Sequence, residues 1–347
     1  MKGLHDMCKA EEIFQQNNIR EHIKKICRNK KHVKLTIGTL MQGEKTIKVW
    51  GETSEIPNAD YVYEIASISK TFLCSILAKY VHERKVSLDD SISKYFDWLD
   101  KDTYYPTLKR LATHTAGYSE LLPLGLFNSI RDGLATYAGI FQNGKILASM
   151  DFEKMKRLLL RNKLRDKDYP FAYSNFGMSV LGYTLGTVDG RGYWGMMDDF
   201  LGNDLGLKNT HTLTPDKIVH GYNRKNKDIG NHVWGYDYSA PDGCLSSTAS
   251  DLLEYARLNI HNTLPYFDLT HQKHAETKEH DMGLAWYLSK ENESIMYHTG
   301  CSNAFVSFLF IDKNTQSACV LLMNYIATDI AANLAMSILK QLSNGSV

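Results

Sequence analysis

The sequence Glu64-Ile65-Ala66-Ser67-Ile68-Ser69-Lys70-Thr71-Phe72 marks a junction between a short strand and a buried helix. Residues 61–65 read as the strand. After the junction, apolar residues recur at helical spacing over a wide face up to about residue 81, which is typical of a helix buried in the protein interior. Ser67 and Lys70 are three residues apart at the start of this helix, so their side chains lie on one face and can touch.

A serine hydroxyl is a weak nucleophile at neutral pH and needs a neighbouring base. Lys70 serves as that base only when its amine is neutral, which requires its pKa to fall by about 3 units from about 10.4, or roughly 4 kcal/mol. Burial against the apolar helix and a nearby cation can supply such a shift. A helix N-terminus also leaves the Ser67 backbone N–H without an intrahelical partner, and the helix dipole there favours developing negative charge.

The same four letters recur as Ser91-Ile92-Ser93-Lys94. This second copy follows Leu88-Asp89-Asp90 and precedes a polar and aromatic stretch, so we interpret it as part of the surface. The strand before Ser67, the buried helix after Lys70 and two further motifs distinguish the first copy from the second.

The first of these motifs is Tyr173-Ser174-Asn175, the only Tyr-x-Asn in the chain. Residues i and i+2 of an extended segment point the same way. We therefore expect Tyr173 to relay a proton between Ser67 and a leaving group, and Asn175 to bind a substrate amide or Lys70. The alternative is a turn before a helix, with Tyr173 as a half-buried aromatic residue.

The second motif is His298-Thr299-Gly300, which falls where one expected strand leads into the next. A glycine allows a substrate backbone to approach closely, and Thr299 offers a hydroxyl. The backbone N–H of Cys301, together with that of Ser67, is a candidate oxyanion hole. The alternative is a tight turn with a solvent-facing histidine.

Strand patterns occupy both ends of the chain and helix patterns occupy the middle. The expected strands are 33–40, 46–50, 61–65, 283–289, 294–297, 305–311 and 318–323, and the clearer helices are 19–27, 72–81, 152–164, 177–188, 247–259 and 328–342. The pattern predicts an α/β (α+β) fold, in which one antiparallel sheet is built from both termini and flanked by helices. A mostly helical region, 87–234, is expected to be inserted into an α/β domain of residues 1–86 plus 235–347, with the site at their junction.

The composition indicates which kinds of molecule the protein can be expected to bind. The chain has 347 residues, 40 basic and 39 acidic, and a net charge of +1, which argues against a nucleic-acid partner. No run of about 18 apolar residues is present, so no membrane span is expected. The first 18 residues lack an apolar segment, which favours a cytoplasmic location as the sequence stands, or a secreted one if a leader was removed. We expect a small-molecule or peptide substrate, and the sequence does not indicate an oligomeric state.

A metal hydrolase is a competing interpretation. Four metal-binding side chains, His271, His274, His280 and Asp281, gather in a polar stretch. They lack a helical His-Glu-x-x-His arrangement, so a solvated loop is favoured. We predict no metal and no cofactor. The six cysteines form no Cys-x-x-Cys pair, which argues against a disulfide framework.

Together the motifs resemble the serine β-lactamase and penicillin-binding-protein superfamily, and above all class C β-lactamases, DD-carboxypeptidases and related esterases. The resemblance covers nearly the whole chain. Beyond the three motifs it includes Leu88-Asp89-Asp90, Leu111-Ala112-Thr113-His114-Thr115-Ala116-Gly117, Ala240-Pro241-Asp242-Gly243 and Ser246-Ser247-Thr248-Ala249-Ser250-Asp251. The resemblance implies an acyl-enzyme mechanism, in which Ser67 attacks a carbonyl, Lys70 and Tyr173 share the proton transfers and water releases the acyl group.

Two departures from this family bear on the substrate. His298 stands where β-lactamases usually have lysine, and a histidine is mostly neutral at pH 7, so we predict weak carboxylate recognition and poor β-lactam hydrolysis. No arginine follows Arg257, so the last strands offer no bidentate clamp for a peptide carboxylate. Asn324 could contact substrate instead, but we expect it to cap a strand end.

The resulting prediction is a serine hydrolase that cleaves an ester or amide, such as a short peptide, a D-amino-acid derivative or a β-lactam-like compound. One alternative is a β-lactamase or peptidoglycan DD-peptidase. Another is a penicillin-binding receptor that becomes acylated and remains so.

Overall fold

The computed structural model describes residues 11–118, 150–213, 215, 217–231, 238–302 and 304–344. Its main sheet contains β1 (Leu35–Met41), β2 (Glu44–Trp50), β3 (Glu55–Ile56), β6 (Ala275–Glu276), β7 (His280–Met282), β8 (Tyr287–Ser289), β9 (Ile295–Cys301), β10 (Val306–Asp312) and β11 (Ser317–Met323). The strand order is β3-β2-β1-β11-β10-β9-β8-β7-β6. Every neighbouring pair is antiparallel.

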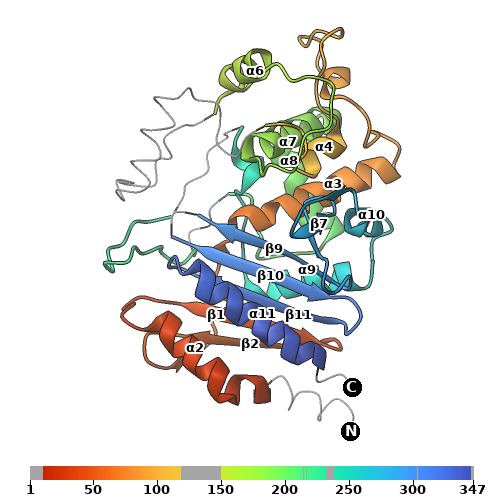
Figure 1. Cartoon of the computed structure of the whole chain (residues 1–347). Coiled ribbons are helices and arrows are strands. Elements are labelled where there is room, and N and C mark those ends of the chain that lie inside the picture. Colours follow the sequence, from red (N-terminus) through yellow and green to blue (C-terminus); the bar gives the residue numbers. More distant parts are fainter. Residues whose placement is uncertain are drawn as a thin grey trace.

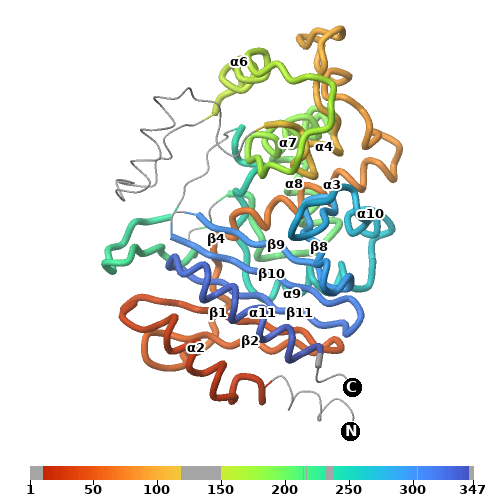
Figure 2. The backbone as a smooth tube through the Cα atoms, in the orientation of Figure 1, coloured from red at the N-terminus to blue at the C-terminus, as the bar shows by residue number. Residues whose placement is uncertain are grey.

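Strands from the two ends of the chain meet in the middle of this sheet. Leu35 of β1 lies opposite Met323 of β11, and Figure 2 shows the red β1 segment beside the blue β11 segment. All residues of β1, β10 and β11 are buried, because helices cover both faces of the sheet (Figure 1). The predicted fold class is confirmed.

The hairpin between β1 and β2 illustrates how local sequence sets this sheet. Met41 pairs with Glu44, which leaves Gln42 and Gly43 as a two-residue loop. Both have positive φ, 50° and 92°, as a turn matched to the twist of the strands requires. The two strands expected at 33–40 and 46–50 therefore pair with one another as a hairpin.

Each face of the sheet is covered by helices. On one face lie α2 (Asn17–Cys27) and α11 (Thr328–Asn344), and the apolar positions predicted for the first helix are buried there. On the other face lie α3 (Ser69–His82) and α9 (Ala249–Ile260). The α9 helix is capped at its start, because the Thr248 side chain accepts a hydrogen bond from the Asp251 N–H.

The remaining helices lie mainly beyond one edge of the sheet (Figure 1). They are α4 (Leu108–Ala112), α6 (Phe152–Arg161), α7 (Asn175–Asp189), α8 (Gly192–Asp199) and α10 (Phe267–His271), together with the short turns η1 (Ala66–Ile68), η2 (Ile92–Tyr95), η3 (Phe200–Asp204) and η4 (Ala240–Asp242). The α7 helix is buried on most sides and ends at Gly190, whose φ is 85°.

Two strand predictions differ from the structure. The strand expected at 61–65 is only β4 (Tyr63–Glu64), which pairs with β5 (Ser246–Ser247) in a separate two-stranded sheet. The strand expected at 283–289 begins only at Tyr287. The reason is a tight turn, in which the Gly283 N–H donates to the Trp286 carbonyl at 2.8 Å.

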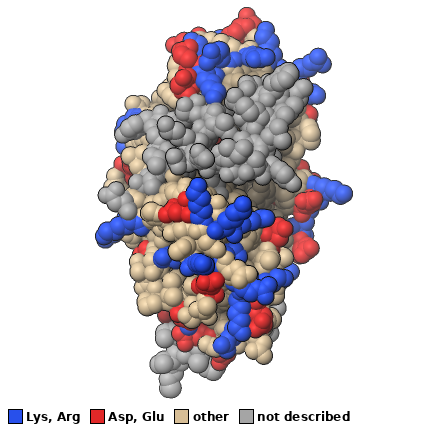
Figure 3. All heavy atoms as spheres, turned by 90° about the vertical axis from the view of Figure 1, so that its left-hand side faces the viewer, with Lys and Arg blue, Asp and Glu red and all other residues tan. Residues whose placement is uncertain are grey.

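Over the described part of the face shown in Figure 3, acidic and basic side chains are interspersed, as expected for a net charge of +1. The helices built from described residues include none that is long and apolar enough to cross a bilayer.

Candidate active site

Ser67 lies in the 3₁₀ turn η1, directly before α3. Ala66 has a φ of 44°, a left-handed conformation that is uncommon for a residue with a side chain. Such a conformation persists where its surroundings hold it. Here the Ile65 carbonyl accepts hydrogen bonds from the Ile68 N–H and, at 2.7 Å, from the Ser307 hydroxyl. Ser67 is half-buried, whereas the residues on either side of it are buried.

Lys70 lies in the first turn of α3 and is fully buried. Its Nζ donates to Ser67 Oγ at 2.9 Å and also to the Asp242 carbonyl in η4. Burial lowers the pKa of Lys70 to about 8, although the nearby Asp242 carboxylate acts in the opposite direction. About one tenth of the amine is therefore neutral at pH 7, and this fraction can accept a proton from Ser67.

Tyr173 comes directly before α7. The Lys70 Nζ lies 5.1 Å from the centre of the Tyr173 ring, so residues far apart in the sequence meet here. The chain direction at this point is set by Ser174, whose Oγ accepts a hydrogen bond from the Gly177 N–H at 3.0 Å and caps the helix. Asn175 is half-buried, and its buried Oδ1 has no hydrogen-bond partner among the described residues.

The hydrogen-bond ladder of β9 determines where the Cys301 backbone points. The Ser302 N–H donates to the Phe305 carbonyl, so the even-numbered residues of this segment bond toward β10. The odd-numbered residues direct their backbone groups to the other edge, which β8 covers only as far as Tyr297. Cys301 therefore directs its N–H toward an edge that no described strand covers.

Gly300 lies directly against the η1 turn that contains Ser67. A Cβ on Gly300 would come within 3.0 Å of the Ser67 nitrogen and would collide with the Ile65 carbonyl and the Ser307 hydroxyl. Only glycine allows β9 to approach Ser67 this closely. Thr299 and Cys301 direct their side chains to the opposite face of β9, so they can border the site only through their backbone groups.

His298 lies on the same face of β9 as Gly300 and is only 1% exposed, so the alternative of a solvent-facing histidine is wrong. Its Nδ1 lies 2.8 Å from the Thr299 carbonyl oxygen. Burial and the neighbouring Lys70 charge lower the pKa of His298 to about 3. The imidazole is therefore neutral at pH 7, and its pKa lies further below 7 than the ordinary value of about 6.5 on which the sequence-based expectation rested.

His114 is a site residue that the sequence motifs did not single out. Its Nδ1 accepts the Ser174 N–H at 3.1 Å and its carbonyl accepts the Ala172 N–H at 2.8 Å, so it bonds to the chain on both sides of Tyr173. The His114 and Tyr173 ring centres are 4.5 Å apart. Burial, Lys70 and His298 hold the pKa of His114 well below its usual range. The available signal was a histidine inside the otherwise apolar and small-residue loop 111–117.

The second Ser-x-x-Lys copy has a different environment. Ser91 caps the short turn η2, and Lys94 is exposed and pairs with Asp90.

The Asn324 side chain is hydrogen-bonded within the protein: its Oδ1 accepts the Lys34 N–H and its Nδ2 donates to backbone carbonyls. The expected strand-end role of Asn324 is confirmed.

The four residues considered as metal ligands do not converge. His271 hydrogen-bonds Asn259, and His274 hydrogen-bonds the Leu269 carbonyl. Among the described residues, no group of three or more histidine, cysteine or acidic side chains is arranged to hold a metal ion.

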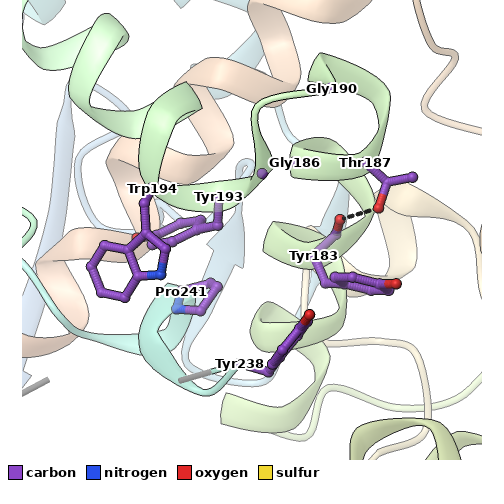
Figure 4. Close-up of a pocket in the computed structure, with 9 residues that line it drawn as sticks. Tyr183, Gly186, Thr187, Gly190, Tyr193, Trp194, Tyr238 and Pro241 are labelled. Atoms are coloured by element: carbon purple, nitrogen blue, oxygen red, sulfur yellow. Dashed lines mark hydrogen bonds between the residues drawn. The ribbon is translucent and has the colours of Figure 1, made fainter. Parts of the chain in front are cut away.

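A separate cavity of about 500 Å³ lies between α7, α8 and the turn that leads into η4 (Figure 4). Aromatic side chains dominate its walls, including Tyr183, Trp194 and Tyr238. No predicted site residue lines it. Its connection to the site is indirect, through Pro241, which precedes the Asp242 carbonyl that contacts Lys70.

Comparison with known proteins identifies the family. Residues 39–341 match the family model Beta-lactamase. The chain therefore belongs to the Beta-lactamase family, whose fold is that of serine hydrolases.

The curated proteins to which the chain is similar include a beta-lactamase and a carboxypeptidase/endopeptidase. The chain is 24% identical to a beta-lactamase of Providencia stuartii over 255 residues, 71% of this chain and 60% of the relative. It is 26% identical to the D-alanyl-D-alanine-carboxypeptidase/endopeptidase AmpH of Escherichia coli K12 over 183 residues, 50% of this chain and 44% of the relative. The matched segments thus cover less than two thirds of these relatives.

Solved structures share the fold. A beta-lactamase from Sulfitobacter sp. EE-36 superimposes with a TM-score of 0.78 at 19% identity, covering 97% of this chain and 99% of that one. A beta-lactamase/D-alanine carboxypeptidase from Pseudomonas syringae superimposes with a TM-score of 0.76 at 18% identity, covering 93% of this chain and 97% of that one. A class C beta-lactamase superimposes with a TM-score of 0.76 at 18% identity, covering 98% of this chain and 97% of that one.

Proposed function

We propose that this protein is a serine hydrolase that forms an acyl-enzyme on Ser67. The observation that carries the proposal is the 2.9 Å contact between the Ser67 hydroxyl and the buried Lys70 amine, whose pKa is lowered to about 8. A neutral Lys70 takes the Ser67 proton as Oγ forms a bond to the substrate carbonyl carbon. The amine keeps one N–H on the Asp242 carbonyl, which holds its lone pair toward Ser67.

The negative charge that develops on the substrate oxygen is stabilised by the Ser67 and Cys301 N–H groups. The position of Gly300 against the Ser67 nitrogen and the outward direction of the Cys301 N–H support this role. Tyr173 donates its proton to the leaving group as the carbonyl–leaving-group bond breaks, and it takes up in exchange the proton that Lys70 received from Ser67. Asn175, His298, Thr299 and Gly300 border the substrate, and water then attacks the acyl-enzyme to regenerate Ser67.

The substrate is an ester or amide of a short peptide or D-amino-acid derivative. The neutral His298 supports this choice over a β-lactam or a peptidoglycan peptide with a free carboxylate, which a lysine at that position would attract. A β-lactamase or DD-peptidase is the second candidate, favoured by the names of the curated relatives. A receptor that stays acylated is the third.

Time-resolved intact mass spectrometry separates these candidates. The protein is mixed with an activated ester, a penicillin or a fluorophosphonate, and the adduct mass is followed from seconds to hours. A hydrolase acylated by the ester returns to its original mass within minutes, whereas a receptor keeps the penicillin mass. Absence of any adduct with all three reagents overturns the proposal.

A further inference from the structure

The two buried histidines of the site are held in opposite tautomers. His114 Nδ1 accepts the Ser174 N–H, so in the neutral ring the proton is on Nε2. His298 Nδ1 faces the Thr299 carbonyl, which can only accept, so its proton is on Nδ1 and its Nε2 carries a bare lone pair. One ring therefore presents a donor at Nε2, and the other presents an acceptor.

Neither Nε2 atom has a hydrogen-bond partner among the described residues, although both rings are 1% exposed. Buried polar atoms are rarely left unsatisfied, so such atoms beside a reactive site point to a polar group of the substrate. His114 lies beside Tyr173, with ring centres 4.5 Å apart, and the Lys70 Nζ is 5.1 Å from the centre of the same Tyr173 ring. A chain of aromatic contacts joins the two histidines: the ring centres are 5.8 Å apart for His114 and Phe171, 6.4 Å for Phe171 and Tyr287, and 5.2 Å for Tyr287 and His298.

The bare lone pair of His298 disfavours a carboxylate. A carboxylate there would be attracted by the charged Lys70, but it would gain a hydrogen bond from His298 only if the ring took up a proton. With a pKa of about 3, that ring resists protonation at pH 7 by about 10⁴-fold. An ammonium group is disfavoured by the neighbouring Lys70, whose amine is mostly charged at pH 7 because its pKa is about 8.

We propose that this part of the site binds an uncharged carboxamide of the substrate, whose N–H donates to His298 Nε2 and whose carbonyl accepts from His114 Nε2–H. An amide carries one donor and one acceptor on the same planar group, which matches the donor and acceptor of the two rings. This inference rests on the proposed acyl-enzyme and specifies its substrate class: acyl donors whose leaving group carries an amide where a carboxylate would otherwise be.

Three thioesters with the same acyl group test the proposal. Their leaving groups are mercaptoacetamide, mercaptoacetate and 2-aminoethanethiol, which carry an amide, a carboxylate and an ammonium group. Ser67 Oγ bonds to the acyl carbon, the C–S bond breaks, and the thiol departs with a proton, so thiol release reports turnover. We expect kcat/KM for the amide to exceed that for the carboxylate at least about 100-fold, because a buried group left unpaired is strongly rejected.

The thiols differ in intrinsic reactivity, so the decisive quantity is the change of the amide/carboxylate ratio between variants. His298→Lys places a cation on this wall and should lower the ratio at least about tenfold. His298→Leu removes the acceptor without adding a charge, and should also lower the ratio even if the lysine variant folds poorly. His261→Lys, at an exposed histidine just after α9, is the matched control and should leave the ratio unchanged.

The possible outcomes are distinct. Acylation of Ser67 with equal rates for amide and carboxylate, and a ratio unchanged in both His298 variants, overturns the carboxamide site and leaves the proposed function intact. A preference for the ammonium thioester overturns it as well. Failure of all three thioesters and of fluorophosphonate to acylate Ser67 contradicts the proposed function itself.

Discussion

The Lys70 amine lies 2.9 Å from the Ser67 hydroxyl and donates a second hydrogen bond to the carbonyl of Asp242, in a turn far along the chain. The first contact is local to one helical turn, whereas the second connects Lys70 to η4. The position and basicity of Lys70 therefore depend on both halves of the sequence.

Replacing Lys70 with methionine should lower the rate at which an activated ester acylates Ser67 by at least about 10³-fold, because the proposed base is removed. The second Ser-x-x-Lys copy provides the control. Lys94→Met removes an exposed lysine that pairs with Asp90 and should change the acylation rate less than twofold. Equal losses in the two variants, measured by stopped-flow burst amplitudes, would remove Lys70 from the mechanism.

The pH dependence of acylation follows from the lowered Lys70 pKa. Only the neutral amine accepts the Ser67 proton, so the acylation rate should rise about tenfold per pH unit below pH 8 and level off above it. A rate that is flat between pH 6 and pH 8, measured with a substrate that carries no titrating group, would show that Lys70 is not the base.

Gly300→Ala should lower both stability and activity. The added Cβ would meet the Ser67 nitrogen at 3.0 Å, together with two other site atoms, and such overpacking typically costs about 1–3 kcal/mol. Gly202→Ala is the control, since no atom outside the adjoining backbone of η3 lies within 4 Å of its added Cβ. Urea unfolding should show a lower free energy of unfolding, and burst kinetics a slower acylation, in Gly300→Ala but not in Gly202→Ala. A fully active, equally stable Gly300→Ala would mean that β9 does not pack against the η1 turn that contains Ser67.

Much of the sheet and of the nucleophile segment could be predicted from local sequence. Ser67 and Lys70 meet because of helical spacing, and the alternation and turn chemistry around Gly43 set the first hairpin. The Asp242 contact could not be predicted, because a backbone carbonyl has no residue signature. His114 is visible in the sequence as a histidine in the loop 111–117, but its bonds to the chain on both sides of Tyr173 exist only in the folded protein and have no sequence pattern. The turn at Gly283 was missed because its apolar neighbours resemble a strand.

Acid should destabilise the protein through His298. Its folded pKa of about 3 lies below the unfolded value of about 6.5, so the unfolded chain binds a proton that the folded one does not. The free energy of unfolding should therefore fall with decreasing pH below 6.5, by about 2 kcal/mol at pH 5 from this group. The free energy of unfolding, measured by urea titration at several pH values, should depend less on pH in the His298→Gln variant. An unchanged slope would show that His298 is not buried and neutral.

The central claim is that Ser67 is the nucleophile. The most direct measurement is fragmentation mass spectrometry of the fluorophosphonate-treated protein, read on the tryptic peptide 49–70, which also contains Ser54 and Ser69. We expect one adduct, on Ser67, and none in the Ser67→Ala protein. An adduct on another serine, or labelling that survives in Ser67→Ala, would contradict the account.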